Sequence, residues 1–168
     1  IGNGDEDTDG VDHASSLDLQ GGTITDVNGN PLASNTLSTT NYPTLNIDGI
    51  KPRVVSVTTP AVPPYNTYYI GQTMPFTVTF DDSVYNSGSP SLRFDNFNDL
   101  WGGNIYATLS AGAGSNTLTF SHLFSNGYQD SDGITLNANI QSPNDLRDVN
   151  GNTIYSALSS TSFAGIAV

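Results

Sequence analysis

The sequence predicts an all-β fold, an antiparallel sandwich built from short strands. Glycine, proline, serine, threonine and asparagine are abundant, a composition typical of strands joined by turns rather than of helices. Short segments in which apolar and polar residues alternate recur through the last two thirds of the chain. No window has the periodicity of an amphipathic helix, so we expect strands to provide the core.

The clearest alternation lies in residues 73–80, where an apolar residue occupies every second position. That period places these side chains on one face of a strand. Clusters of turn-forming residues separate similar segments, at the spacing of an antiparallel sandwich. The predicted strands are residues 52–60, 73–80, 91–94, 104–109, 116–124, 133–140 and 162–168.

The chain contains a partial copy of itself. The pentapeptide DVNGN occurs at residues 26–30 and again 122 positions later, at residues 148–152. The tetrapeptide DTDG at residues 7–10 is followed 123 positions later by DSDG, and YPTLNI is followed 121 positions later by FAGIAV. A period of roughly 120 residues is too long for a solenoid and is typical of whole domains in tandem.

This repeat predicts the domain organisation. Residues 1–48 are interpreted as the C-terminal strands of a preceding or incomplete repeat with its linker, and residues 49–168 as one complete repeat. A two- or three-stranded fragment is only marginally stable in water. Residues 1–48 therefore need either upstream residues or a neighbouring subunit that accepts their strands. Donation of these strands to a neighbouring subunit would generate a filament.

The charge of the chain excludes several classes of partner. The formal net charge is −12, with only four basic residues. Nucleic acid and anionic membrane surfaces both require a basic footprint, so neither is expected as a partner. No apolar stretch is long enough to insert directly into a membrane. The chain has no cysteine, and a metal ion is one alternative means of stabilising an extracellular domain.

The acidic residues are almost all aspartate, since Glu6 is the single glutamate among sixteen acids. Aspartate suits tight oxygen cages around Ca²⁺, which takes six to eight oxygen ligands. The alternative is acidic solvation without a bound ion. The candidate calcium ligands are Asp5, Asp7, Asp9, Asp48, Asp81, Asp82, Asp130, Asp132, Asp148 and Asn150.

Strand direction predicts where these residues lie. If the strands alternate, Asp48, Asp81, Asp82 and Asp148 share one end of the sandwich, and Asp130 lies at the other. End-to-end stacking of two repeats then brings the earlier copy of the Asp130 segment to the first end. A divalent cation at this junction would convert carboxylate repulsion into a rigid joint.

Two motifs carry this prediction, and each has a simpler reading. DEDTDG at residues 5–10 matches the start of an EF-hand loop, but Ser16 stands at the twelfth position and Tyr128 replaces the first aspartate of the second copy. The segment is therefore not an EF-hand. It supplies either two or three ligands to a shared site or only an acidic turn. DVNGN is likewise a hairpin-turn signal, with or without a ligand beside it.

Several segments together resemble a known family. DGIKP (48–52), TMPFTVTFDDSV (73–84), SNTLTFSHLF (115–124) and the two motifs above are similar to the tandem immunoglobulin-like repeats of large bacterial surface proteins. The chain departs from the family pattern at residues 81–84, DDSV in place of Ser-Glu-Pro-Val, and at DVNGN in place of Asp-x-Ala-Gly-Asn.

The resemblance implies an immunoglobulin-like β-sandwich with Greek-key connections. It also implies an extracellular role at the cell surface, as a calcium-stiffened extender of an adhesin. The partners it implies are neighbouring copies of the repeat, with any surface glycan or protein bound through other domains. Asp82 stands where the family has glutamate, and its shorter side chain has less reach toward a metal ion.

No catalytic motif is present in the sequence, and the chain is predicted not to be an enzyme. Of its two histidines, His122 lies in a predicted strand as a structural residue and His13 lies in the acidic segment. A binding module for carbohydrate or protein is a further alternative, with loop packing as the simpler explanation of the same aromatic residues. These residues are Tyr65, Tyr68, Tyr69, Phe97 and Trp101.

Overall fold

The computed structural model describes residues 1–38, 40–60, 66–98, 103–125, 128, 130 and 133–168, with the side chains of residues 96–98 excepted. The chain divides into two compact units, which we call unit 1 (Ile1–Ile50) and unit 2 (Lys51–Val168). The prediction of an all-β fold is confirmed: the described residues form antiparallel strands and one short 3₁₀ turn, with no α-helix among them. Consequently, none of the described residues belongs to a helix that would span a membrane.

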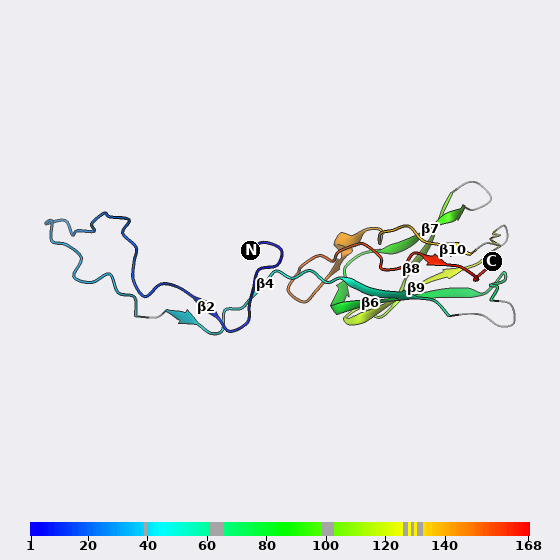
Figure 1. The fold of residues 1–168 in the computed structure, drawn as a ribbon, viewed down its shortest axis with the longest axis horizontal. Coiled ribbons are helices and arrows are strands. Elements are labelled where there is room, and N and C mark those ends of the chain that lie inside the picture. Colours follow the sequence, from blue (N-terminus) through cyan, green and yellow to red (C-terminus); the bar gives the residue numbers. More distant parts are fainter. Residues whose placement is uncertain (39, 61–65, 99–102, 126–127, 129, 131–132) are drawn as a thin grey trace. The chain divides into compact units, whose positions relative to one another are not determined.

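Unit 2 is built on a curled antiparallel sheet (Figure 1). The central strand is β6, whose alternating apolar residues face the core. The strand order of the sheet is β11-β6-β9-β8-β7. β5 also pairs with β6. The strands are β5 (Val54–Thr58), β6 (Thr73–Asn86), β7 (Ser91–Asn98), β8 (Asn104–Ala111), β9 (Ser115–Leu123) and β11 (Leu146–Arg147).

The central strand is longer than the sequence predicts. Asp81 and Asp82 were expected to follow the strand that starts at Thr73, but β6 continues through them to Asn86. Its register against β9 shifts between Thr79 and Val84, which leaves the aspartates in an irregular section. The strand continues because its last residues pair with β11, a segment about sixty positions away.

The last part of unit 2 folds back on itself as a long, irregular hairpin, which we call the C-terminal hairpin (residues 133–168). It contains β10 (Ile134–Thr135), η1 (Pro143–Asp145), β11 and β12 (Ser162–Phe163). Its outgoing arm lies along β7, where Phe94 pairs with Leu136. Its returning arm lies beside the start of unit 2, where the Tyr155 N–H donates to the Pro52 carbonyl at 2.8 Å. The hairpin therefore joins the two edges of the curled sheet.

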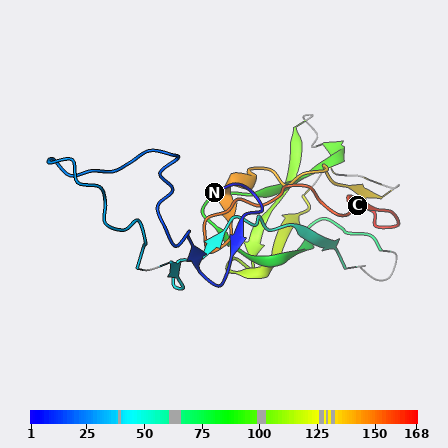
Figure 2. The same ribbon diagram turned by 60° about the vertical axis from the view of Figure 1, so that its left-hand side comes forward.

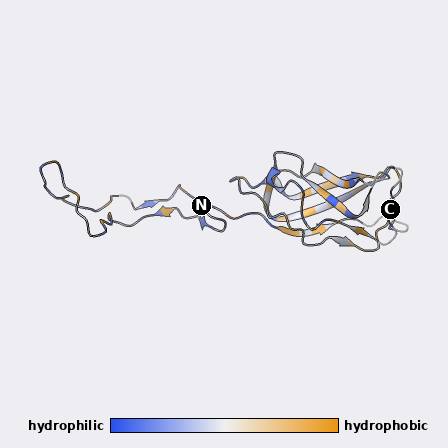
Figure 3. Ribbon diagram, turned by 90° about the horizontal axis from the view of Figure 1, so that it is seen from above, coloured by the Kyte–Doolittle hydropathy of each residue, from blue (hydrophilic) through white to orange (hydrophobic). Residues whose placement is uncertain are grey.

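The core of unit 2 lies between the sheet and the C-terminal hairpin. The Phe76 ring lies 5.7 Å from Phe94 within the sheet and 5.5 Å from Phe163 of the hairpin. Figure 3 shows the alternation of apolar and polar residues along the strands of this unit. The buried residues are Val57, Tyr68, Met74, Phe76, Val78, Phe80, Val84, Leu92, Phe94, Ile105, Ala107, Leu118, Phe120, Phe124, Ile134, Leu136, Ile140, Leu146, Ile154 and Ile166.

Unit 1 is a second long hairpin, and the described residues of this unit contain no larger sheet (Figure 2). Two short antiparallel ladders hold its arms together, one between β1 and β4 and one between β2 and β3. Its tip is the first DVNGN segment, where Thr25 pairs with Pro31. The strands are β1 (Glu6–Asp7), β2 (Val11–Asp12), β3 (Asn41–Tyr42) and β4 (Ile47–Asp48).

Unit 1 repeats the hydrogen-bond pattern of the C-terminal hairpin. Val11 pairs with Tyr42 in the β2–β3 ladder, and Ile134 pairs with Phe163 in the β10–β12 ladder; these residues are related by the same offsets as the repeated sequence. Four further pairs of unit 1 have equivalents in the C-terminal hairpin. Ser16–Thr36 corresponds to Asn139–Ala157, Thr25–Pro31 to Arg147–Thr153, His13–Thr40 to Leu136–Thr161, and Leu17–Asn35 to Ile140–Ser156. Two segments repeated in sequence thus share one backbone structure.

The two hairpins differ in the burial of their apolar side chains. Positions that are almost fully covered in unit 2 are open to solvent within unit 1. The exposed fractions in unit 1 are 42% for Leu17, 47% for Ile24, 43% for Leu32 and 56% for Leu45; their equivalents Ile140, Leu146, Ile154 and Ile166 are 1%, 0%, 6% and 9% exposed. The apolar residues are repeated, whereas the part of the chain that the structure describes has a covering sheet only in unit 2.

One matched pair of substitutions tests the orientation of β5. Val57 is 5% exposed and Val55 is 58% exposed on the same strand. Val57→Ala should lower the free energy of unfolding by about 2 kcal/mol more than Val55→Ala, because only the first removes buried methyl groups. Urea unfolding measures both values, and the lost β-propensity is common to the two variants. Equal effects would mean that β5 does not present Val57 to the core.

Candidate functional site

The candidate ligands in unit 1 lie around the β1–β4 ladder. Glu6 pairs with Asp48, which places Asp5, Asp7 and Asp48 along one short stretch of paired backbone. Each of these three carboxylates accepts a backbone N–H: Gly2 donates to Asp5 at 2.5 Å, Gly10 to Asp7 at 3.0 Å and Ile50 to Asp48 at 2.9 Å. Asp9 lies exposed in the turn between β1 and β2.

The candidate ligands in unit 2 also accept backbone hydrogen bonds. Arg53 donates its N–H to the Asp81 carboxylate at 2.7 Å, and the Ser83 N–H lies 2.5 Å from the Asp82 carboxylate. Asp132 lies outside the described residues. Among the residues that the structure describes, no three acidic or histidine side chains are grouped closely enough to hold a metal ion.

The DVNGN turn is organised by its first residue. Asp148 is 4% exposed. One of its carboxylate oxygens accepts the N–H groups of Asn150 and Asn152, at 2.9 and 2.8 Å, and the other accepts the Asn152 side-chain amide at 2.8 Å. In unit 1, Asp26 makes the same three bonds to Asn28 and Asn30. These bonds, the side-chain amide of Asn30 first, hold the pKa of Asp26 below its ordinary value.

The DTDG and DSDG segments share a second structural device. The Gly133 N–H donates to the buried Asp130 carboxylate at 3.0 Å, as Gly10 does to Asp7. Gly133 has a φ of +111°, and a Cβ there would lie 2.9 Å from the backbone of Ala164 on the opposite arm. Aspartate followed three residues later by glycine therefore closes the arms of the hairpin. This role explains the motif without requiring a metal ion.

The preference for aspartate over glutamate thus has a physical cause in the fold. A short carboxylate reaches a backbone N–H two or three residues away, and glutamate reaches it less readily. A carboxylate with one capped oxygen keeps lone pairs for a cation, so capping and calcium binding are compatible. Asp148 has little remaining capacity, because both of its oxygens accept hydrogen bonds within a buried turn. The calcium ligands remain a prediction.

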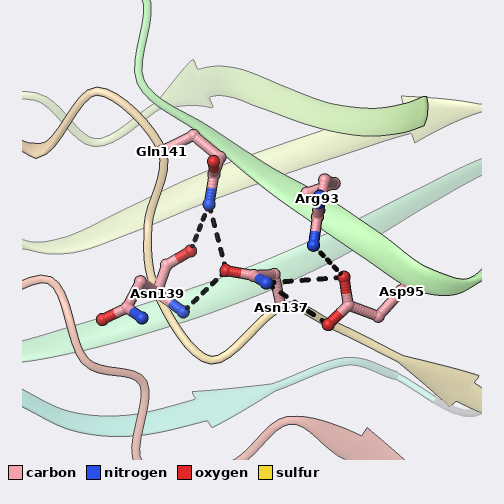
Figure 4. A network of polar contacts seen from close by, with 5 residues as sticks. All are labelled: Arg93, Asp95, Asn137, Asn139 and Gln141. Atoms are coloured by element: carbon pink, nitrogen blue, oxygen red, sulfur yellow. Dashed lines mark hydrogen bonds and ion pairs between the residues drawn. The ribbon is translucent and has the colours of Figure 1, made fainter.

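A polar network that the sequence did not indicate joins β7 to the outgoing arm of the C-terminal hairpin (Figure 4). Arg93 forms an ion pair with Asp95 at 2.6 Å, and the Asn137 amide donates to both Asp95 oxygens at 3.3 and 3.4 Å. The side-chain oxygen of Asn137 accepts hydrogen bonds from the Asn139 backbone N–H and from the Gln141 side-chain amide, both at 3.2 Å. No local signal in the sequence connects Asp95 with Asn137, which lie 42 positions apart.

The aromatic residues considered for a binding platform are divided by the structure. Tyr68 belongs to the core: it is buried, its ring lies 5.8 Å from Phe124, and its hydroxyl donates to the Pro60 carbonyl at 3.0 Å. Tyr69 is exposed. Tyr65, Trp101 and the side chain of Phe97 lie outside the described residues.

His122 lies in an aromatic cluster at the end of β9. Its ring centroid lies 5.3 Å from Phe94, 5.0 Å from Phe124 and 5.5 Å from Tyr128, and its Nδ1 is 2.8 Å from the Tyr106 carbonyl oxygen. Burial lowers the pKa of His122 below its ordinary value of 6.5, while the hydrogen bond with Tyr106 acts in the opposite direction. The neutral imidazole is therefore favoured in the folded state, as expected of a structural residue.

Comparison with models of known protein families, with curated proteins and with solved structures finds no match to this chain.

The Asp148 turn makes a direct prediction about stability. Asp148→Ala removes the acceptor of three hydrogen bonds in a buried turn and should lower the free energy of unfolding of unit 2 by about 2–3 kcal/mol. Asp82→Ala removes one bond at an exposed position and should cost less than about 0.5 kcal/mol. Urea unfolding in EGTA compares the two variants without a metal contribution. A small loss for Asp148→Ala would show that the turn does not depend on its carboxylate.

His122 makes the stability of unit 2 depend on pH. Because its pKa is lower in the folded state, the unfolded chain binds more protons below pH 6.5. The contribution of His122 to stability is therefore complete above pH 6.5 and declines as the pH falls from 6.5 toward the folded pKa. His122→Asn keeps a donor near the Tyr106 carbonyl and should flatten the dependence of the melting temperature on pH between pH 7.5 and 5. An unchanged slope in His122→Asn would contradict this assignment.

Proposed function

We propose that this chain is a non-catalytic extracellular structural segment, a calcium-stiffened spacer of a bacterial surface adhesin. The observation that carries the proposal is the pair of hairpins with equivalent hydrogen bonds, one in each unit. A structural unit that recurs at a period of roughly 120 residues is typical of domains arranged in an array, where each copy extends the whole. The partners of such a segment are neighbouring copies of the repeat.

The fold proposed for each complete repeat is an immunoglobulin-like sandwich with Greek-key connections. It is supported by the antiparallel sheet of unit 2, by the hairpin that packs across this sheet and by the aromatic core between them. The resemblance in sequence to immunoglobulin-like repeats of bacterial surface proteins points to the same fold and to the cell surface.

Calcium has two proposed positions. In unit 1, Asp5, Asp7 and Asp48 place acidic side chains along the β1–β4 ladder, and Asp48 lies two positions before Ile50, the last residue of unit 1. In unit 2, Asp81 and Asp82 are adjacent and exposed in the irregular section of β6. A chain with a formal net charge of −12 has few cations of its own to balance these groups. A bound Ca²⁺ would neutralise them and restrict motion at the linker.

A filament subunit is the second candidate function. The exposed apolar positions of unit 1 favour it, because donation of this hairpin to a neighbouring subunit would cover them. A head-to-tail contact that does not close on itself generates an open fibre.

Thermal melts in EGTA and in millimolar calcium, followed by size-exclusion chromatography with light scattering, separate these functions. Calcium at a hundredfold excess over its dissociation constant should raise the melting temperature by on the order of 10 °C. Asp48→Asn should reduce this rise, whereas Asp18→Asn, an exposed aspartate outside the predicted ligands, should leave it unchanged.

A monomer with a calcium-raised melting temperature would support the spacer. Long assemblies would favour the filament and count against the spacer. The absence of any response to calcium would contradict the metal-binding part of the proposal.

A further inference from the structure

We propose that unit 1 binds the core face of a sheet like β5–β9 that belongs to another, non-identical copy of the repeat. Unit 1 would take the position that the C-terminal hairpin occupies in unit 2. This inference rests on the proposed function as a repeat array and identifies the partner of one segment within it.

The identity of the partner follows from unit 2. The same hairpin, with the same pairing register, is buried there against this kind of sheet. The apolar character of six covered or partly covered positions is kept in unit 1. The equivalent residues, with the unit 1 residue first in each pair, are Val11–Ile134, Leu17–Ile140, Ile24–Leu146, Leu32–Ile154, Leu45–Ile166 and Ile47–Val168.

The backbone hydrogen bonds at the edge of the hairpin favour the same kind of partner sheet. In unit 2 the Asn137 N–H donates to the Arg93 carbonyl and the Gln141 N–H donates to the Ser91 carbonyl, both at 2.8 Å, which attaches the outgoing arm to β7. By the repeat offset, Ala14 and Asp18 are the equivalent residues of unit 1. Their backbone N–H groups are placed to attach the same arm to the β7 strand of the partner.

Two positions indicate that the partner sheet differs from this one. Leu136 is 2% exposed and pairs with Phe94 of β7, but its equivalent in unit 1 is His13. The His13 Nδ1 already lies 2.7 Å from the Ala14 carbonyl oxygen, so burial beside the apolar Phe94 side chain would take Nε2 out of water without a new hydrogen bond. The partner of unit 1 should therefore carry a polar residue where this sheet carries Phe94.

The second position is Asn137, whose amide binds the Asp95 carboxylate. Its equivalent is Ala14, which has no polar side chain to replace that bond. The sheet of this chain therefore matches its own C-terminal hairpin better than it matches unit 1. Exchange between identical copies is disfavoured, and a different copy of the repeat is the better partner.

An extended chain tests this inference. A second copy of residues 51–127 is fused directly to Asp5 of the chain. Asp5 is the equivalent of Tyr128, so unit 1 then follows a sheet in the same way as the C-terminal hairpin does in unit 2. The extended chain carrying His13→Leu and Ala14→Asn should show a second cooperative transition in calorimetry, with a total unfolding enthalpy about twice that of the original chain. The extended chain without these substitutions should show the second transition at least about 10 °C lower, which corresponds to a difference of a few kcal/mol.

Two controls make the result specific. The same two substitutions in the original chain should add no transition, and Leu45→Asp in the extended chain should abolish the second transition and leave the first. The absence of a second transition in the doubly substituted extended chain would overturn the proposal, and equal transitions with and without the substitutions would overturn its claim of a non-identical partner. All scans are made in EGTA, so a failure of the calcium proposal does not affect the outcome.

Discussion

The structure depends on the burial of one apolar face, where the C-terminal hairpin of unit 2 packs across the curled sheet. The hairpin has only short ladders of backbone hydrogen bonds, and such a hairpin is marginally stable alone in water. Contacts such as that between Phe163 and Phe76 supply what the ladders lack, since buried apolar area is the main stabilising contribution to a domain. The Arg93–Asp95–Asn137 network adds polar contacts between β7 and the outgoing arm of the hairpin. Among its described residues, unit 1 has the ladders without a covering sheet, and the proposed partner sheet would supply it.

Several aspartates of this chain stabilise turns of the fold through hydrogen bonds that require no metal ion. Asp7 and Asp130 close the arms of the two hairpins through glycine N–H groups, and Asp26 and Asp148 organise the two tips. A repeat needs these hydrogen bonds between carboxylates and backbone N–H groups to form the same backbone. The repeated sequence motifs therefore have a structural role. Calcium binding, as proposed, uses carboxylates that have already been positioned by capping. The two roles are compatible where one carboxylate oxygen remains available.

The sequence was sufficient for the all-β class, the antiparallel strands and the buried alternation of Met74 and Phe76 in β6. It was not sufficient for the length of β6, because the alternation stops at Asp81 and the continuation depends on pairing with β11, far along the chain. Residues 133–140 read as one strand, yet only Ile134–Thr135 forms a ladder with β12. The later residues make isolated pairs on both sides, Leu136 with Phe94 of β7 and Asn139 with Ala157 of the returning arm. An acidic turn and a hairpin turn were the simpler readings of the two aspartate motifs, and the structure adds the carboxylate bonds that organise these turns. The calcium ligands follow from residue type and predicted position alone.

Hydrogen exchange of equivalent amides in the intact chain tests the central claim most directly. The N–H groups of His13, Leu17 and Leu37 make the same backbone hydrogen bonds as those of Leu136, Ile140 and Leu158. If packing against the sheet stabilises the hairpin, the unit 2 amides should exchange at least about a hundredfold more slowly than their unit 1 equivalents. Equal protection in the two units would mean that the hairpin is stable by itself, and would contradict the account.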